Sequence, residues 1–240
     1  NPLHTDNFEE VSFGPILYGA KKLGMHIHTR YEVSNNAGQD ICDIVNNEGF
    51  DFLLVGSGIS MSDSPDDIAA TRYRTSFYNR YFKRFKAPES WFYPGALLKD
   101  KTKMFIARSN CDVGVFINRN FVKATNTLVV ISSEEDLFLL DYTRTLLKAT
   151  HGSVGIVAKM STTTPGHDQI LKELWDFVSS IPQTQLLPDK DLTPGLFNSY
   201  NFMLIGYNTW NDVSEHRKEA LQKMPSTLIL NKNKRSSSDN

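Results

Sequence analysis

Short apolar runs alternate with amphipathic stretches along most of the chain, and each run is typical of a strand buried on both faces of a parallel sheet. Such strands are predicted at residues 50–56, 112–117, 127–131, 154–158, 202–205 and 227–230, with an alternating strand at 25–33. Apolar positions at helical spacing predict helices at residues 11–23, 37–47, 134–149, 169–179 and 212–223. Residues 182–199 contain three prolines and are predicted to form an irregular connection. This order predicts an α/β fold with mainly parallel sheets and right-handed crossovers.

One apolar run recurs later in the chain. Phe50–Gly56 matches Tyr200–Gly206 at an offset of 150 positions, with identical residues at three of them. Each copy is followed by a predicted helix and then by an apolar strand that ends in asparagine, at Asn118 and Asn231. We interpret the repeat as two related α/β units in tandem, and chance similarity between buried strands is the alternative.

The two predicted units differ in completeness. They span residues 1–122 and 123–231, and residues 232–240 are expected to form a disordered tail. The first unit is incomplete at its N-terminus, because no opening β-α-β precedes residue 11. It also carries an insertion at residues 60–94, which has no counterpart in the second unit.

The composition limits the classes of protein to consider. The chain has 240 residues, 40% hydrophobic and 22% charged, with a formal net charge of -1. These values exclude a mostly disordered chain and argue against a protein that is basic overall and binds nucleic acid. No apolar run approaches the roughly 18–20 residues that cross a bilayer, so we expect a domain without a membrane segment. The sequence starts with polar residues and lacks an initial Met, so we interpret the chain as a fragment of a longer protein.

A resemblance to known families rests on the order of several stretches. A five-stranded β-α unit with a strand such as Asp112–Ile117 near its end resembles the universal stress protein fold, a member of an adenine-nucleotide-binding α/β superfamily. Two such units in tandem, one of them degenerate, resemble the cytosolic C-terminal region of monovalent cation/proton antiporters. Fungal potassium/proton antiporters and plant cation/proton exchangers have this layout. The stretches that carry the resemblance are residues 50–58, 112–121, 127–148 and 200–231.

The resemblance implies a role and a place in the cell. The chain would be a regulatory domain, without catalysis of its own, at the cytosolic face of the membrane that holds a potassium/proton antiporter. Its partner would be the membrane domain of the same protein, with a homodimer and anionic lipid as further partners and no nucleic acid. The Asn-rich and Ser-rich composition favours a fungal source and an endomembrane such as Golgi, endosome or vacuole. The alternative is a free-standing, nucleotide-binding universal stress protein.

A glycine turn is the candidate nucleotide site. Gly56, Ser57 and Gly58 follow a buried strand, where backbone N–H groups can approach a phosphate at the carboxyl end of a parallel sheet. Asn118 ends the neighbouring predicted strand and is expected nearby. In nucleotide-binding stress proteins the glycine run is longer, and three nearby aspartates would repel a phosphate. A plain tight turn is therefore favoured over a bound adenine nucleotide, and no cofactor is expected.

A basic, aromatic stretch at residues 72–86 is the candidate docking surface. Landmarks that lie 25 positions apart in the second unit lie 62 apart in the first, so about 37 extra residues surround this stretch. Six aromatic side chains share one face of a predicted helix. Docking on the transporter domain or on anionic lipid is predicted, and packing of the aromatics on their own domain is the alternative. The basic residues are Arg72, Arg74, Arg80, Lys83, Arg84 and Lys86.

No catalytic or metal-binding set stands out. His26 and His28 share one face of a predicted strand, but a metal site needs a third ligand that the sequence does not place. No Ser/His/Asp arrangement or carboxylate pair points to catalysis, so no enzyme activity is expected. Cys42 and Cys111 are expected to be buried, reduced thiols.

Overall fold

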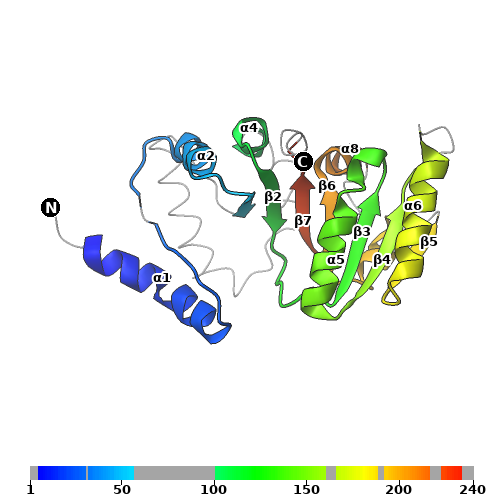
Figure 1. Ribbon diagram of the computed structural model, residues 1–240, viewed down its shortest axis with the longest axis horizontal. Helices are drawn as coiled ribbons and strands as arrows, with labels where there is room; N and C mark the ends of the chain where they lie inside the picture. Colours follow the sequence, from blue (N-terminus) through cyan, green and yellow to red (C-terminus); the bar gives the residue numbers. More distant parts are fainter. Residues whose placement is uncertain are drawn as a thin grey trace. The chain divides into compact units, whose positions relative to one another are not determined.

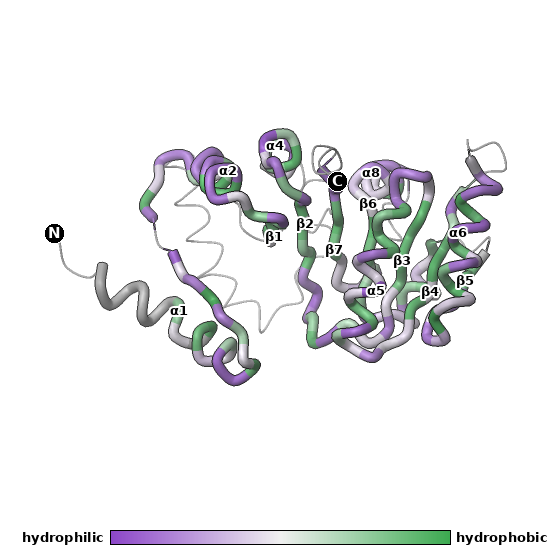
Figure 2. Tube along the Cα trace, in the orientation of Figure 1, coloured by the Kyte–Doolittle hydropathy of each residue, from purple (hydrophilic) through white to green (hydrophobic). Residues whose placement is uncertain are grey.

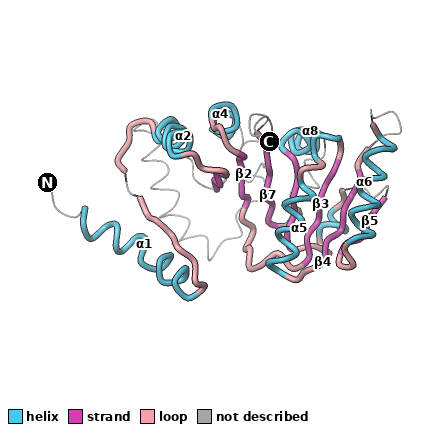
Figure 3. Tube along the Cα trace, viewed as in Figure 1, coloured by secondary structure: helices cyan, strands magenta, loops and turns pink. Residues whose placement is uncertain are grey.

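The computed structural model describes residues 5–30, 32–56, 101–160, 166–188, 192–216 and 223–233. The chain divides into two compact bodies, Asn1–Ala37 and Gly38–Asn240, which differ from the two predicted units. The smaller body contains helix α1 (Thr5–Lys22), which begins earlier than the sequence predicts. Residues without regular structure follow α1, as the pink segment in Figure 3 shows.

The strand predicted at residues 25–33 is wrong for the described part of that range. These residues lie outside any strand, and Met25, Ile27 and Val33 are exposed. Alternation predicts a face that can be buried, but a strand forms only where a second strand completes its backbone hydrogen bonds. Among the described residues, no strand pairs with this segment.

A seven-stranded sheet is the centre of the larger body, Gly38–Asn240 (Figure 1). Its spatial order is β1-β2-β7-β6-β3-β4-β5, and every neighbouring pair is parallel except β2 and β7. The strands are β1 (Phe52–Gly56), β2 (Asp112–Ile117), β3 (Asn126–Ile131), β4 (Ser153–Ala158), β5 (Thr184–Pro188), β6 (Phe202–Gly206) and β7 (Ser226–Asn231). The predicted α/β fold with a mostly parallel sheet is confirmed.

Helices cover both faces of this sheet. The apolar residues of α5 and α6 pack in one buried cluster with one face of the sheet, and those of α7 and α8 pack against the other face. Figure 2 shows the strands as largely hydrophobic and the helices as mixtures of hydrophobic and hydrophilic residues. The described helices of the larger body are α2 (Ala37–Glu48), α4 (Lys101–Arg108), the 3-10 helix η2 (Glu134–Asp136), α5 (Leu139–Thr150), α6 (His167–Ser180), α7 (Pro194–Phe197) and α8 (Tyr207–His216).

The connection predicted as irregular at residues 182–199 contains two elements. Thr184–Pro188 forms β5, which lies at the edge of the sheet, where a terminal proline costs no ladder hydrogen bond. Pro194 begins α7, because a proline fits the first position of a helix and its missing N–H leaves no bond unmade. The Thr193 hydroxyl caps this helix by accepting the Leu196 N–H at 3.2 Å.

The two predicted units share one sheet, because their last strands pair with each other. In this pairing Val115 lies opposite Ile229, with Gly114 opposite Leu230 and Phe116 opposite Leu228. The predicted boundary between residues 122 and 123 stays a prediction. The predicted insertion at residues 60–94 lies outside the described residues, as does most of the predicted tail at 232–240.

The strand registers reveal a pseudo-twofold axis. Phe52 pairs with Asp112 in the first unit, and its counterpart Phe202 pairs with Ser226 in the second, so β2 and β7 match at an offset of 226 − 112 = 114. Val115 and Ile229 differ by the same 114, so their pair maps onto itself and lies on the axis. The repeat predicted from β1 and β6 therefore has a structural counterpart.

The register corrects one detail of the predicted repeat. At an offset of 114, Asn231 corresponds to Ile117 and not to Asn118, which the sequence comparison matched with it. The matching asparagines are a coincidence of composition. A slip of one residue matters in a strand, because it moves every side chain to the opposite face of the sheet.

Asp112 joins the two halves of the sheet at the start of β2. Its carboxylate accepts the Tyr142 hydroxyl at 2.9 Å and the Asn233 backbone N–H at 2.8 Å. The Tyr142 ring also lies 5.9 Å from the ring of Phe52, centroid to centroid. Burial raises the pKa of Tyr142, and the hydrogen bond to Asp112 and its nearby charge raise it further. Tyr142 therefore stays neutral and holds α5 against β1 and β2.

Tyr142→Phe should lower the free energy of unfolding at pH 7 by about 1–2 kcal/mol, because it removes one buried hydrogen bond and keeps the ring. The difference from wild type should shrink above about pH 10, the usual pKa of an unfolded tyrosine, because only wild type loses stability as that group ionises. Urea unfolding across this pH range measures both effects.

A matched control is Thr145→Val on the same helix, where an exposed hydroxyl donates to the Asp141 carbonyl at 3.1 Å. Its effect should stay within about 0.5 kcal/mol. Equal stability of Tyr142→Phe and wild type at pH 7 would contradict the proposed joint.

Candidate functional site

The carboxyl ends of β3 and β6 form the switch point of the sheet. The chain continues from β3 to β4 on one side, whereas β6 lies against the other side of β3 and continues to β7. In open α/β sheets, ligands collect in the crevice above this point, because the loops from the two strands separate there. The second unit therefore has a defined place to look for a site.

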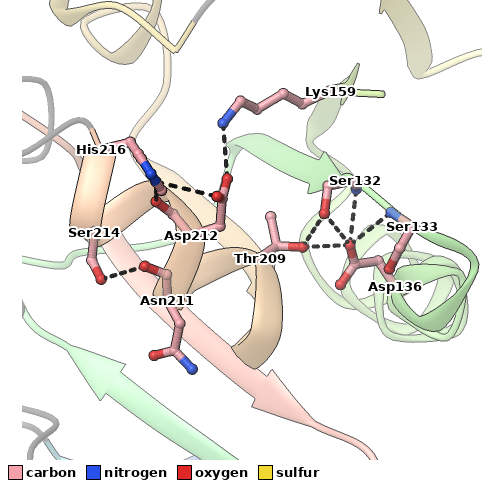
Figure 4. A network of polar contacts seen from close by, with 9 residues as sticks. All are labelled: Ser132, Ser133, Asp136, Lys159, Thr209, Asn211, Asp212, Ser214 and His216. Carbon is pink, nitrogen blue, oxygen red and sulfur yellow. Dashed lines mark hydrogen bonds and ion pairs between the residues drawn. The ribbon is translucent and has the colours of Figure 1, made fainter. Parts of the chain in front are cut away.

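A buried carboxylate lies at this point, as Figure 4 shows. Asp136 is 2% exposed, and its Oδ2 accepts the backbone N–H groups of Ser132 at 2.8 Å and Ser133 at 3.3 Å. The same oxygen accepts the Ser132 hydroxyl at 3.2 Å and the Thr209 hydroxyl at 2.6 Å. The Ser132 and Thr209 hydroxyls also contact each other. Four donors thus satisfy one buried carboxylate.

Gly206 lets this carboxylate approach the end of β6. A Cβ atom added to Gly206 would overlap Asp136 Oδ1, so any larger residue would displace the carboxylate. Thr209 lies in the first turn of α8, where a negative charge is stabilised by the helix dipole. Asp136 therefore occupies the position in which a bound anion would meet the start of α8.

Further polar contacts lie near the Asp136 network, and Figure 4 shows most of them. Lys159 Nζ lies 3.3 Å from the Asp212 carboxylate, and His216 Nδ1 contacts both the Asp212 carbonyl, at 2.8 Å, and its carboxylate, at 3.2 Å. The Asn208 amide donates to the Glu135 carboxylate at 2.8 Å. Asp212 and His216 are more than half exposed, so solvent and salt screen these ion pairs.

The chemistry of the site is that of a satisfied structural network. Both hydroxyls are hydrogen-bonded to Asp136, whereas the ring of His216 is bonded to Asp212, so the described residues form no Ser/His pair at this point. In the described part of the chain, no three His, Cys, Asp or Glu side chains are placed to hold a metal ion. No described helix is long and apolar enough to cross a membrane.

The predicted nucleotide site lies at the carboxyl end of β1, on the opposite side of the sheet from the Asp136 network. Gly56 ends β1 as predicted, and because β2 is antiparallel to β7, this end faces away from the carboxyl ends of the second unit. Asn118 follows β2, and its Oδ1 accepts the Phe121 N–H at 2.9 Å, so the side chain closes a local turn. Ser57 and Gly58 lie outside the described residues, so the plain tight turn favoured over a bound nucleotide at this place stays a prediction.

The predicted docking residues also lie outside the described part of the chain. These are Arg72, Arg74, Arg80, Lys83, Arg84 and Lys86. The two cysteines are free and buried, as predicted, and burial raises the pKa of both thiols.

Part of the Asp136 network is local in sequence. Ser133 directly precedes the helix predicted at residues 134–149, and the Asp136 carboxylate three positions later accepts the Ser133 N–H. The contact with Thr209 was missed, because 73 residues separate the two. The sequence signal for this contact is Gly206, a glycine that ends a buried strand directly before a helix.

Comparison with known proteins gives a similar fold without a sequence match. No protein-family model and no curated protein matches the chain. The structure is similar to a universal stress protein from Archaeoglobus fulgidus DSM 4304, with a TM-score of 0.51 and 12% sequence identity over 95% of this chain and 79% of that chain. It is also similar to a functionally unknown protein from Pseudomonas aeruginosa PAO1, with a TM-score of 0.45 and 10% identity over 94% and 78%. The first similarity shows a universal-stress-protein-like fold, and the fold alone.

Gly206→Ala should lower the free energy of unfolding by about 1–3 kcal/mol, because the added methyl group overlaps the Asp136 carboxylate. Chemical denaturation measures the change. Gly56→Ala is the matched control, since Gly56 occupies the equivalent register position and an added Cβ there meets no atom of the described residues within 4 Å.

A double variant tests the assigned cause. In the Asp136→Ala background, Gly206→Ala should cost much less than in wild type, because residues in contact are energetically coupled. Equal costs of Gly206→Ala and Gly56→Ala, or no coupling with Asp136→Ala, would contradict the packing described for Asp136.

Proposed function

We propose that the chain is a non-catalytic regulatory domain that acts on the cytosolic side of a monovalent cation/proton antiporter. One observation carries the proposal: the carboxylate of Asp136 fills the ligand position at the switch point of the second unit. A phosphate placed there would meet a like charge in a poorly solvated site, which costs far more than the same contact in water. A domain with this crevice filled is better suited to protein contacts than to turnover of a nucleotide.

The antiporter is proposed from the sequence resemblance described above. The universal-stress-protein-like fold fits that resemblance, because such units are what the cytosolic regions of these antiporters resemble. The basic stretch at residues 72–86 would supply the contact with the transporter or with anionic lipid. The competing proposal is a free-standing nucleotide-binding universal stress protein.

Titration calorimetry with ATP, AMP and cyclic dinucleotides separates these two proposals. We expect no binding heat at millimolar concentration, because the second-unit crevice is filled and the glycine turn of the first unit is short. A universal stress protein known to bind ATP, titrated in the same way, is the positive control. Binding heat that disappears in Gly58→Asp would assign a nucleotide to the glycine turn and favour the competing proposal.

Charge reversal tests the proposed docking. In the Arg80→Glu/Lys83→Glu/Arg84→Glu variant, binding to phosphatidylserine vesicles should fall, because each basic residue near an anionic surface contributes about 1 kcal/mol. Wild-type binding should also weaken with added salt, since screening acts over about 8 Å at physiological ionic strength. The complete reading frame that contains these residues should encode membrane-spanning segments, and its potassium/proton antiport should change in the same variant.

The control reverses three exposed lysines among the described residues, Lys123, Lys148 and Lys172, which changes the net charge by the same amount. This variant should bind vesicles like wild type or nearly so. Equal loss in both variants would show a non-specific charge effect. A reading frame without membrane-spanning segments would overturn the antiporter proposal.

A further inference from the structure

One edge of β1 has no partner strand among the described residues. β2 pairs with one edge of β1, and among the described residues no strand pairs with the other. The pseudo-twofold axis maps β1 onto β6, and β6 has neighbours on both edges, β7 and β3. The described part of the first unit thus has no counterpart of β3, and β1 is the last strand in the order of the sheet.

Two leucines at equivalent positions differ in exposure, in line with the missing neighbour of β1. Leu54 and Leu204 occupy the same register position in β1 and β6, yet Leu54 is 58% exposed and Leu204 is 2% exposed. Both lie on the same face of the continuous sheet, because a twofold axis perpendicular to the sheet keeps each face on its own side. Exposure of a large apolar side chain on a strand that lacks a neighbour marks a surface suited to contact.

The second unit shows what buries this position. β3 runs parallel to β6 and places Val129 opposite Leu204. The helix that follows β3 then covers the same face, so that Leu204 lies in one buried cluster with Leu139 and Leu140 of α5. A bare strand would complete the hydrogen bonds of the edge, but a following helix is needed to cover the leucine.

We propose that the open edge of β1 binds a strand–helix segment of another protein chain. The strand runs parallel to β1, carries bulky apolar residues in the manner of β3, and is followed by an amphipathic helix that buries Leu54. The hydrogen bonds of the added strand give affinity, and the apolar contact with Leu54 gives specificity. This inference does not depend on the proposed antiporter, because it rests on the registers and on the two leucines alone.

A peptide of residues 126–150, the strand–helix segment that covers Leu204, is the probe. Hydrogen exchange is followed at the β1 amides that do not bond to β2, in the full chain with and without peptide. At ten times the Kd, their exchange should slow about elevenfold, since protection scales as one plus ligand concentration over Kd. A peptide of the same composition in scrambled order should give no protection.

Leu54→Asp should weaken peptide binding at least about tenfold, because it places a charge under the covering helix. Leu54 is exposed in the free protein, so the variant should fold, and Leu54→Ser replaces it if the circular dichroism spectrum changes. Trp175→Asp is the matched control, since Trp175 is also exposed, at 53%, and lies on α6.

Three outcomes overturn the proposal. The first is strong protection of the β1 amides without peptide, because the edge is then filled by the chain itself. The second is protection that appears at β6 and not at β1, which shows exchange of the peptide with β3. The third is unchanged binding in both Leu54 variants. Protection at β1 that Leu54→Asp abolishes and Trp175→Asp preserves supports it.

Discussion

The antiparallel pairing of β2 with β7 is the constraint on which the rest of the structure depends. Every other neighbouring pair in the sheet is parallel and belongs to one half, so this pairing alone makes the two halves continuous. It sets the axis at Val115 and Ile229, and it brings Asp112 within reach of Tyr142 and Asn233. A shift of one residue would move both the apolar faces and this carboxylate out of place.

The same pairing gives the two halves opposite directions. The parallel strands of the second unit have their carboxyl ends on one side of the sheet, where Asp136 is buried against Thr209. Those of the first unit have their carboxyl ends on the opposite side, at Gly56 and next to Asn118. The second half has five strands and helices on both faces, whereas the described part of the first has two strands and an exposed Leu54. The second half thus has a core that helices cover on both faces, whereas the described part of the first half leaves an apolar side chain exposed.

Local patterns were enough to predict most strands, because a run such as Leu128–Ile131 is apolar at every position and is buried at every position. The polar and proline-containing β5 was missed, since an edge strand needs no such run. A strand was wrongly predicted at 25–33, because alternation of apolar and polar residues carries no information on whether a partner strand exists. Contacts between distant residues, such as Asp136 with Thr209, are invisible to periodicity and need the folded chain.

The pairing of β2 with β7 also has a consequence for synthesis of the protein. β2 ends at Ile117, but its partner extends to Asn231, so about 110 further residues must leave the ribosome before the two strands can pair. At about 5–20 residues per second, the first half waits roughly 6–22 seconds with one edge of the apolar strand β2 unpaired. The nascent chain is therefore most exposed to aggregation in its first half, and chaperones that bind apolar strands would act there during translation.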